Sequence, residues 1–261
     1  MNDEEILARI IEEAKRDPNI LGLYLSGSRG KGLPTKYSDY DIEIVVKDKV
    51  AKRYKLKFKR RKIKNFGFTV YSLSEFKKHA ALGTEEEYDR PSFTHVKAIV
   101  DKLQGKIQKL IDEKGKLPKK QIKTYVSERL DAFINYIYRS LKCIRDKNYV
   151  CARLEAARAI QFFFEIIFGL EGRVAPYYKY LQWELKNYPL KKFPLKPKQI
   201  IKSVLKILEN ADAKTQRRLF RIVEKVFRRE GYGSVFDSWG EEALKFLRGE
   251  KKNAHHKNHN A

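Results

Sequence analysis

The sequence predicts an α+β fold in which an N-terminal mixed sheet with flanking helices is followed by an all-helical bundle domain. Short apolar or alternating segments, separated by turn residues, occupy the first part of the chain as strands would. Beyond about residue 120, apolar residues instead recur at the spacing of amphipathic helices. The 261 residues are enough for two domains. We therefore expect domains at 1–118 and 119–250, and a disordered polar tail at 251–261.

The N-terminal domain is predicted to begin with an amphipathic helix. Apolar residues recur at helical spacing over 3–16, and Asp17-Pro18-Asn19 follows as a helix stop. Residues 20–26 are short and apolar, as a buried strand would be. The other predicted elements are a glycine-rich loop at 27–32, a strand at 40–46, a helix at 74–81 and a strand at 94–101.

Residues 54–70 are predicted to form a two-stranded ribbon with one apolar and one basic face. Aromatic and aliphatic residues alternate with lysines before the tip at 60–62, and Phe66, Phe68 and Val70 alternate after it. If RNA binds there, we expect Lys55, Lys57 and Lys59 to contact its phosphates; a solvated basic face is the alternative.

The C-terminal domain is predicted to consist of helices. Gly169 and Gly231 stand where helix ends are expected, and Ser238-x-x-Glu241 matches the capping-box pattern at a helix start. The predicted helices are 122–145, 149–168, 175–187, 198–209, 213–229 and 239–248.

The chain is strongly basic, with 57 Lys and Arg against 33 Asp and Glu and a formal net charge of +24. The excess is uneven, since residues 47–64 carry 11 basic side chains and one acidic one. Such a field attracts nucleotides, RNA or acidic surfaces. A charge-rich surface with a single Met is equally typical of a thermophile.

The sequence gives no sign of a membrane protein. Its apolar runs are far shorter than the roughly 20 residues of a membrane span, and the N-terminal segment is acidic and amphipathic, unlike a signal peptide. Cys143 and Cys151 form no C-x-x-C pair, so we expect them to be reduced, buried thiols without zinc. A cytoplasmic protein without a membrane partner is therefore expected.

Residues 22–46 contain the residues that predict chemistry. Asp39 and Asp41 are two apart on a predicted strand, so their side chains should share one face. Adjacent carboxylates repel each other unless a cation lies between them, and Mg²⁺ prefers oxygen ligands. Gly27 allows backbone N–H groups to approach a phosphate, and the Ser28 hydroxyl adds a donor. The pattern predicts a site for a metal-bound triphosphate.

Gly27-Ser28 followed by Asp39-Tyr40-Asp41 resembles the nucleotidyltransferase superfamily of DNA polymerase beta. The resemblance implies a nucleotidyltransferase-type sheet and an enzyme that needs Mg²⁺, at one or two sites, and an NTP. Asp39 and Asp41 would be catalytic metal ligands, and Gly27, Ser28 and Arg29 would bind the nucleotide. The transfer of a nucleoside monophosphate to a hydroxyl would release pyrophosphate.

The superfamily usually places a third carboxylate on a neighbouring strand, and the candidate segment 66–70 has none. Asp101 is the first candidate for this catalytic acid, and Glu87 and Asp89 are the alternatives. Asp101 could equally be a turn residue. A site without a third acid would be weak or inactive.

Residues 153–183 are similar to the helical domain of antibiotic-type nucleotidyltransferases, the lincosamide and aminoglycoside kind. The similarity comprises a long apolar helix, the Gly172-Arg173 turn, and Pro176, Tyr177 and Lys179. It implies that Tyr177 and Lys179 bind the acceptor. A core helix followed by an ordinary amphipathic helix is the alternative interpretation.

These resemblances lead us to expect nucleotide transfer from an NTP to a small hydroxylated acceptor, by a monomer or a homodimer. One alternative is transfer to RNA or to a protein. Another is a non-catalytic nucleotide- or RNA-binding module with a decayed site.

Overall fold

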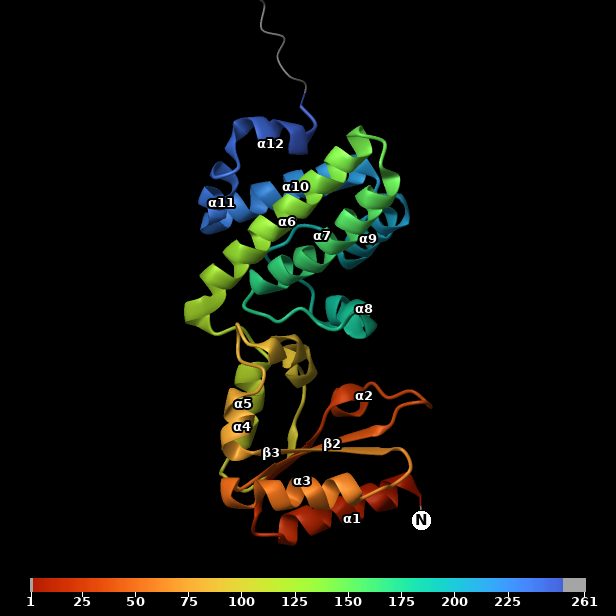
Figure 1. Ribbon diagram of the computed structural model, residues 1–261, viewed down its shortest axis with the longest axis vertical. Coiled ribbons are helices and arrows are strands. Elements are labelled where there is room, and N and C mark those ends of the chain that lie inside the picture. Colours follow the sequence, from red (N-terminus) through yellow and green to blue (C-terminus); the bar gives the residue numbers. More distant parts are fainter. Residues whose placement is uncertain (1, 251–261) are drawn as a thin grey trace, which may run out of the picture. The chain divides into compact units, whose positions relative to one another are not determined.

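A computed structural model describes residues 2–250 of the chain. The chain separates into two compact units, with the division between Pro118 and Lys119 (Figure 1). The tail at 251–261, for which the sequence predicts disorder, lies outside the described residues.

The N-terminal unit contains a four-stranded mixed sheet, which confirms the predicted fold class. The strand order is β3-β2-β1-β4. Strand β1 runs antiparallel to both of its neighbours, whereas β2 and β3 are parallel. The strands are β1 (Ile20–Leu25), β2 (Tyr40–Val46), β3 (Phe66–Ser72) and β4 (Ala98–Asp101).

Helices cover both faces of this sheet (Figure 1). On one face, α1 and α3 pack on Ile42 and Ile44 of β2. On the other, α4, α5 and a 3₁₀ segment pack on Val45 of the same strand. The two faces therefore take alternate residues of β2, as a pleated strand requires. These elements are α1 (Asp3–Arg16), α2 (Gly27–Gly30), η1 (Asp48–Val50), α3 (Ala51–Arg60), α4 (Leu73–Lys78), η2 (Glu85–Phe93) and α5 (Lys106–Lys114).

The predicted ribbon at 54–70 is wrong in its first half, because residues 51–60 form helix α3. Tyr54 and Phe58 are buried, whereas Leu56 is 49% exposed. Spacing of four residues, rather than alternation, therefore explains which residues pack on the sheet. The lysines between them are exposed on a helix, not along a strand face. Only the second half of the predicted ribbon is a strand, β3.

The C-terminal unit is helical throughout its described part, as predicted. Its longest helices, α6 and α7, form an antiparallel hairpin with a core that includes Phe133, Ile137, Ala156 and Phe163 (Figure 1). The elements are η3 (Lys119–Gln121), α6 (Ile122–Arg145), α7 (Tyr149–Gly169), α8 (Tyr178–Asn187), α9 (Pro197–Asn210), α10 (Ala213–Phe227), the π-helical η4 (Arg228–Tyr232), α11 (Gly233–Asp237) and α12 (Gly240–Arg248). None of the described helices combines the length and apolar character that a membrane crossing requires.

Two local predictions for this unit are wrong. Ser238 does not cap α12: the helix begins after Trp239, and the Ser238 hydroxyl donates to the carbonyl of Val235. Cys143 and Cys151 are half-buried rather than buried, and they form a disulfide instead of remaining as thiols. The short turn between α6 and α7 brings their Cα atoms to 5.9 Å, within the range that a disulfide spans.

Candidate active site

Asp39 and Asp41 lie where β2 begins. Asp39 is exposed and directly precedes the strand, and Asp41 is its half-buried second residue. The parity of β2 places the Asp41 side chain on the sheet face opposite to α1 and α3. The two residues lie two apart at the start of β2, and their joint role as metal ligands stays a prediction.

The Asp41 carboxylate lies between two glycines. A Cβ on Gly27, which has a φ of +59°, would stand 2.5 Å from Asp41 Oδ2, and one on Gly67 would stand 3.5 Å from Oδ1. Gly67 is the residue of β3 that pairs with Asp41. The glycines at these positions leave room for the carboxylate and keep it close to backbone on both sides.

Glu43 is a third acid on the same face, which the sequence reasoning missed. It lies two residues beyond Asp41 on β2, and its Oε1 accepts a hydrogen bond of 2.9 Å from the Ser26 hydroxyl. Its Oε2 is buried and has no hydrogen-bond partner within the described chain. Burial raises the pKa of Glu43 to about 7; hydrogen bonds from the Ser26 and Thr69 side chains oppose the rise, and the charges of Asp89 and Asp41 add to it.

The signal for Glu43 was present in the sequence. Asp39, Asp41 and Glu43 alternate, so three acids share a parity on one strand. The β3 residues that pair with Asp41 and Glu43 are Gly67 and Thr69, neither of which is acidic.

Asp101, the first candidate for the third acid, lies elsewhere in the sheet. It ends β4, which is separated from β2 by β1, and it pairs with Gly22 rather than with Leu25, the neighbour of Ile42. Its carboxylate accepts hydrogen bonds from the backbone N–H groups of Leu103 (2.9 Å) and Gln108 (3.0 Å). Asp101 therefore holds the start of α5, and the structure does not bring it to Asp41.

The alternatives Glu87 and Asp89 differ in their surroundings. Glu87 Oε2 accepts a hydrogen bond of 2.6 Å from the backbone N–H of Gly83. Asp89 Oδ2 lies 2.8 Å from His79 Nε2, and its charge raises the pKa of Glu43. Of the three candidates for the third acid, Asp89 is thus the one whose charge acts on Glu43.

Ser28 and Arg29 hold the segment that precedes Asp39. The buried Ser28 hydroxyl donates to Ser38 Oγ at 2.7 Å. Arg29 donates from Nε to the carbonyl of Asp39 (3.1 Å) and from Nη2 to that of Ser38 (3.1 Å), and its guanidinium lies 3.6 Å from the centroid of the Tyr40 ring. Both residues contact the protein here; their role toward nucleotide phosphates stays a prediction.

Tyr177 and Lys179 lie at the start of α8 in the C-terminal unit. Tyr177 precedes the helix and is 38% exposed, and Lys179 is exposed with its Nζ 5.6 Å from the Tyr180 ring centroid. Arg173 Nη1 donates to the carbonyl of Tyr188 at 2.8 Å, which fixes the other end of the helix. The role of Tyr177 and Lys179 in acceptor binding stays a prediction.

The carboxylates fit Mg²⁺ shared with a nucleotide better than a metal held by protein alone. The part of the chain that the structure describes contains no cluster of three or more His, Cys, Asp or Glu suited to a metal. Mg²⁺ is typically held by one or two carboxylates together with substrate phosphates and water. Asp39 and Asp41 would supply those two carboxylates, and the glycines beside Asp41 leave room for its carboxylate.

One known protein family matches most of the chain. A family model described as a nucleotidyltransferase domain matches residues 7–206, more than half of the chain. A crystal structure of a nucleotidyltransferase-like protein from Exiguobacterium sibiricum 255-15 is similar over 95% of this chain and 88% of that chain, with 10% identity and a TM-score of 0.46. A search of curated proteins finds no match to the sequence.

Proposed function

The chain belongs to the family of nucleotidyltransferase domains, and we propose that it transfers a nucleoside monophosphate from an NTP to a hydroxyl of a small molecule. The observation that supports this most strongly is the position of Asp41, between Gly27 and Gly67 and on one face with Asp39 and Glu43. Carboxylates at the start of β2 can bind the Mg²⁺ that accompanies a triphosphate, and glycine backbone beside them can approach the phosphates closely.

In the proposed reaction, the acceptor hydroxyl oxygen attacks the α-phosphorus of the NTP. A new P–O bond forms, the bond from the α-phosphorus to the bridging oxygen of the β-phosphate breaks, and pyrophosphate leaves with that oxygen. Asp39 and Asp41 would hold Mg²⁺, which when bound neutralises charge on the phosphates. The hydroxyl proton passes to a carboxylate, for which Glu43 is the candidate because it lies two residues beyond Asp41 on the same strand.

Arg29 acts in this proposal as a positioning residue. Its hydrogen bonds to the carbonyls of Ser38 and Asp39, and its contact with the Tyr40 ring, fix the backbone on both sides of the Asp39 carboxylate. A planar fork with two fixed donors holds such a segment better than a lysine would.

A small acceptor is supported by the resemblance of residues 153–183 to antibiotic-type helical domains and by the exposed Tyr177 and Lys179 at the start of α8. An RNA hydroxyl is the second candidate, favoured by the basic surface of the N-terminal unit. Transfer to a protein, or nucleotide binding without catalysis, would leave the same carboxylates in place.

Pyrophosphate release tests the proposal. Each of the four NTPs is incubated with Mg²⁺ and with aminoglycosides, lincosamides or a single-stranded RNA. We expect release with a small acceptor, no release in EDTA, and none from Asp41→Asn. Asp101→Asn is the matched control: it makes the same chemical change, should lose about 1 kcal/mol of stability as a lost helix cap, and should keep the activity.

Release with RNA alone would replace the small acceptor by RNA. NTP binding without release from any acceptor would favour the non-catalytic interpretation. Equal release from the wild type and Asp41→Asn would refute the assigned site.

A further inference from the structure

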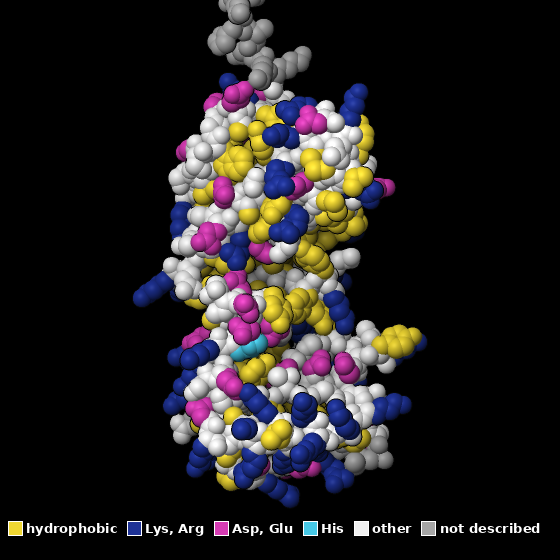
Figure 2. Space-filling model, in the orientation of Figure 1, with side chains coloured by type: hydrophobic (Ala, Val, Ile, Leu, Met, Phe, Trp, Pro, Cys, Tyr) yellow, Lys and Arg dark blue, Asp and Glu magenta, His cyan; other side chains and the backbone are white. Residues whose placement is uncertain are grey.

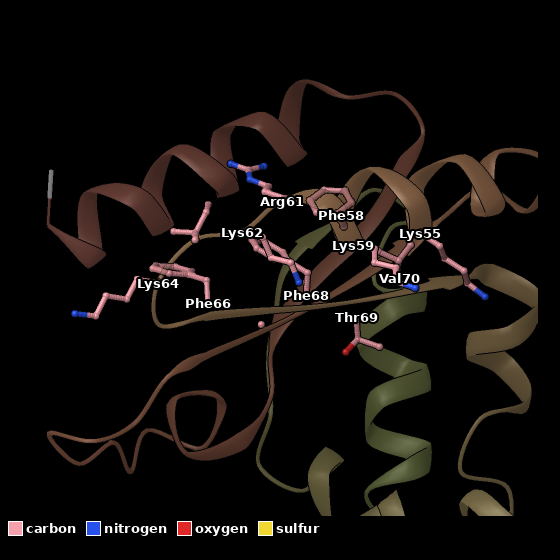
Figure 3. Close-up of a pocket in the computed structure, with 12 residues that line it drawn as sticks. Lys55, Phe58, Lys59, Arg61, Lys62, Lys64, Phe66, Phe68, Thr69 and Val70 are labelled. Carbon is pink, nitrogen blue, oxygen red and sulfur yellow. The ribbon is translucent and has the colours of Figure 1, made fainter.

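A groove runs between α3 and the outer strand β3, with the 61–65 segment at one end (Figure 3). Its volume is about 630 Å³. Phenylalanine rings form its floor and lysines its rim. We call this feature the basic groove; the residues used in the argument are Phe58, Phe66, Phe68, Lys59, Lys62 and Lys64.

The rim carries cations that the protein does not neutralise. Of the five cationic side chains that line the groove, Lys55 pairs with Glu75 and Arg61 pairs with Glu13, each at 2.6 Å. The other three, on the rim, form no ion pair with any residue that the structure describes. Figure 2 shows Lys and Arg side chains gathered over this part of the N-terminal unit. An anionic ligand would supply the missing charge.

The floor offers aromatic surface beside these cations. Phe66 stacks on Tyr40 with ring centroids 4.5 Å apart, and Phe68 lies 5.3 Å from Phe58. Phe66 and Phe68 are nonetheless only half-buried, so part of each ring remains accessible from the groove. Aromatic rings among lysines are the usual platform for unpaired bases, which stack while their phosphates contact the cations.

The strand edge itself argues against an added peptide strand. β3 is the outermost strand on its side of the sheet, but the N–H of Phe66 already donates to the carbonyl of Ile63 at 3.2 Å. That bridge closes the start of the edge to further backbone pairing. The lysines and half-buried rings along the rest of the groove favour recognition through charge and stacking.

We propose that the basic groove binds single-stranded nucleic acid without sequence preference. Its unneutralised cations are lysines, which contact phosphates as point charges and do not read base edges. The phenylalanines accept any base, since every base has a stacking face.

The groove is separate from the carboxylate site. Phe66, Phe68 and Tyr40 belong to the sheet face that packs with α1 and α3, whereas Asp41 lies on the opposite face. The inference therefore goes beyond the proposed transfer reaction. Asp41→Asn should bind the oligonucleotide as tightly as the wild type does.

Fluorescence anisotropy with a labelled oligouridylate of about 12 nucleotides, across a salt series, tests the proposal. Two triple variants with equal charge loss are compared: Lys59→Gln/Lys62→Gln/Lys64→Gln in the groove, and Lys97→Gln/Lys106→Gln/Lys116→Gln, whose exposed lysines lie on and around β4 and α5. We expect the groove triple to bind about 100-fold more weakly at about 100 mM salt, with a slope of log affinity against log salt flatter by about 2. The control triple should change affinity by less than about threefold.

Phe68→Leu separates stacking from charge. It should weaken binding about fivefold or more and leave the salt slope unchanged. No binding by the wild type at low salt, or equal slopes for the two triples, would overturn the proposal. Equal affinity for a duplex of the same length would refute the single-strand assignment. Equal affinity for a labelled polyglutamate, lost in the same groove triple, would reassign the groove to an acidic protein.

Discussion

The guanidinium carbon of Arg29 lies 3.6 Å above the ring centroid of Tyr40, while the same guanidinium donates to the carbonyl of Asp39, one residue earlier. Tyr40 in turn stacks on Phe66 of β3, with the rings 6° from parallel. One side chain thus connects the backbone of a proposed metal ligand to the aromatic packing of the sheet edge. The position of Asp39 depends on this stack as well as on the strand.

Replacing Arg29 by Lys should weaken nucleotide binding without removing the charge. A lysine cannot make both carbonyl hydrogen bonds while it lies flat on the Tyr40 ring. We expect affinity for MgATP, measured by calorimetry, to fall about 10-fold, as for other supports of metal ligands. Arg60→Lys, at an exposed position of α3, is the control and should leave the affinity unchanged. An unchanged affinity in Arg29→Lys would show that the strand alone positions Asp39.

Asp39→Asn and Asp41→Asn should each weaken Mg²⁺-dependent NTP binding at least about 100-fold, since each removes a charged ligand. Their circular dichroism spectra should match that of the wild type, because Asp39 is exposed and Asp41 is half-buried. EDTA should weaken binding to the wild type to the same extent. Unchanged calorimetric affinities for MgATP and MgGTP in both variants would refute the metal site.

Gly27→Ala should damage the site more than Gly32→Ala does. Both glycines have a positive φ, +59° and +70°, so both substitutions should cost about 1–2 kcal/mol of backbone strain. Only at Gly27 does the added Cβ meet Asp41 Oδ2, at 2.5 Å; at Gly32 it meets no atom within 4 Å. We expect the two variants to have similar free energies of unfolding. Only Gly27→Ala should lose MgATP binding. Equal MgATP affinities would mean that Asp41 can move aside at no cost.

Lys114 predicts a pH dependence of stability. Its ammonium lies 5.3 Å from the ring centroid of Phe76 and 5.7 Å from that of Phe93, and burial, with a smaller contribution from Arg90, lowers the pKa of Lys114 to about 8. Between this value and its ordinary 10.5, the folded state binds fewer protons than the unfolded state. The contribution of Lys114 to the free energy of unfolding therefore rises with pH across that window, and the cost of burying the charge is fully present below it.

Urea unfolding of the wild type and Lys114→Met, followed by circular dichroism at about pH 7 and about pH 10, measures this contribution. Between these two pH values, the free energy of unfolding of the wild type should rise by about 1–2 kcal/mol relative to that of the variant. This figure allows for partial solvation of the ammonium. Lys109→Met is the control, since Lys109 is 76% exposed, and it should show no such difference. A wild type and a Lys114→Met variant that respond identically to pH would contradict the lowered pKa.

The strand that precedes Gly27 and the strand that carries Asp41 were predicted well from the sequence, because their apolar residues are buried in a sheet with helices on both faces. The prediction failed at residues 51–60, because lysines alternate with the apolar residues over 54–58 and this stretch satisfies both alternation and four-residue spacing. Only the packing of Tyr54 and Phe58 on the sheet, with Leu56 left outside, decides between the two.

For the site, local pattern was sufficient for Asp39 and Asp41 but not for the residues around them. Asp101 is a plausible third acid from the sequence alone, but in the sheet β1 lies between its strand, β4, and β2. Asp101 holds the start of α5 through hydrogen bonds from Leu103 and Gln108, and no sequence motif predicts these contacts. The contacts of Arg29 with Ser38 and Asp39 likewise depend on how the loop of residues 30–37 folds back on itself.

The alternation along β2 limits where residues can be inserted into the chain or deleted from it. Tyr40, Ile42, Ile44 and Val46 fill one core, while Asp41 and Glu43 point to the other side. Inserting or deleting one residue inside the strand would exchange the two sets, driving carboxylates among isoleucines. Residues 32–37, which precede Ser38 and include the exposed Tyr37, carry no such parity. Changes in chain length between relatives should therefore accumulate in that loop and stop at Ser38.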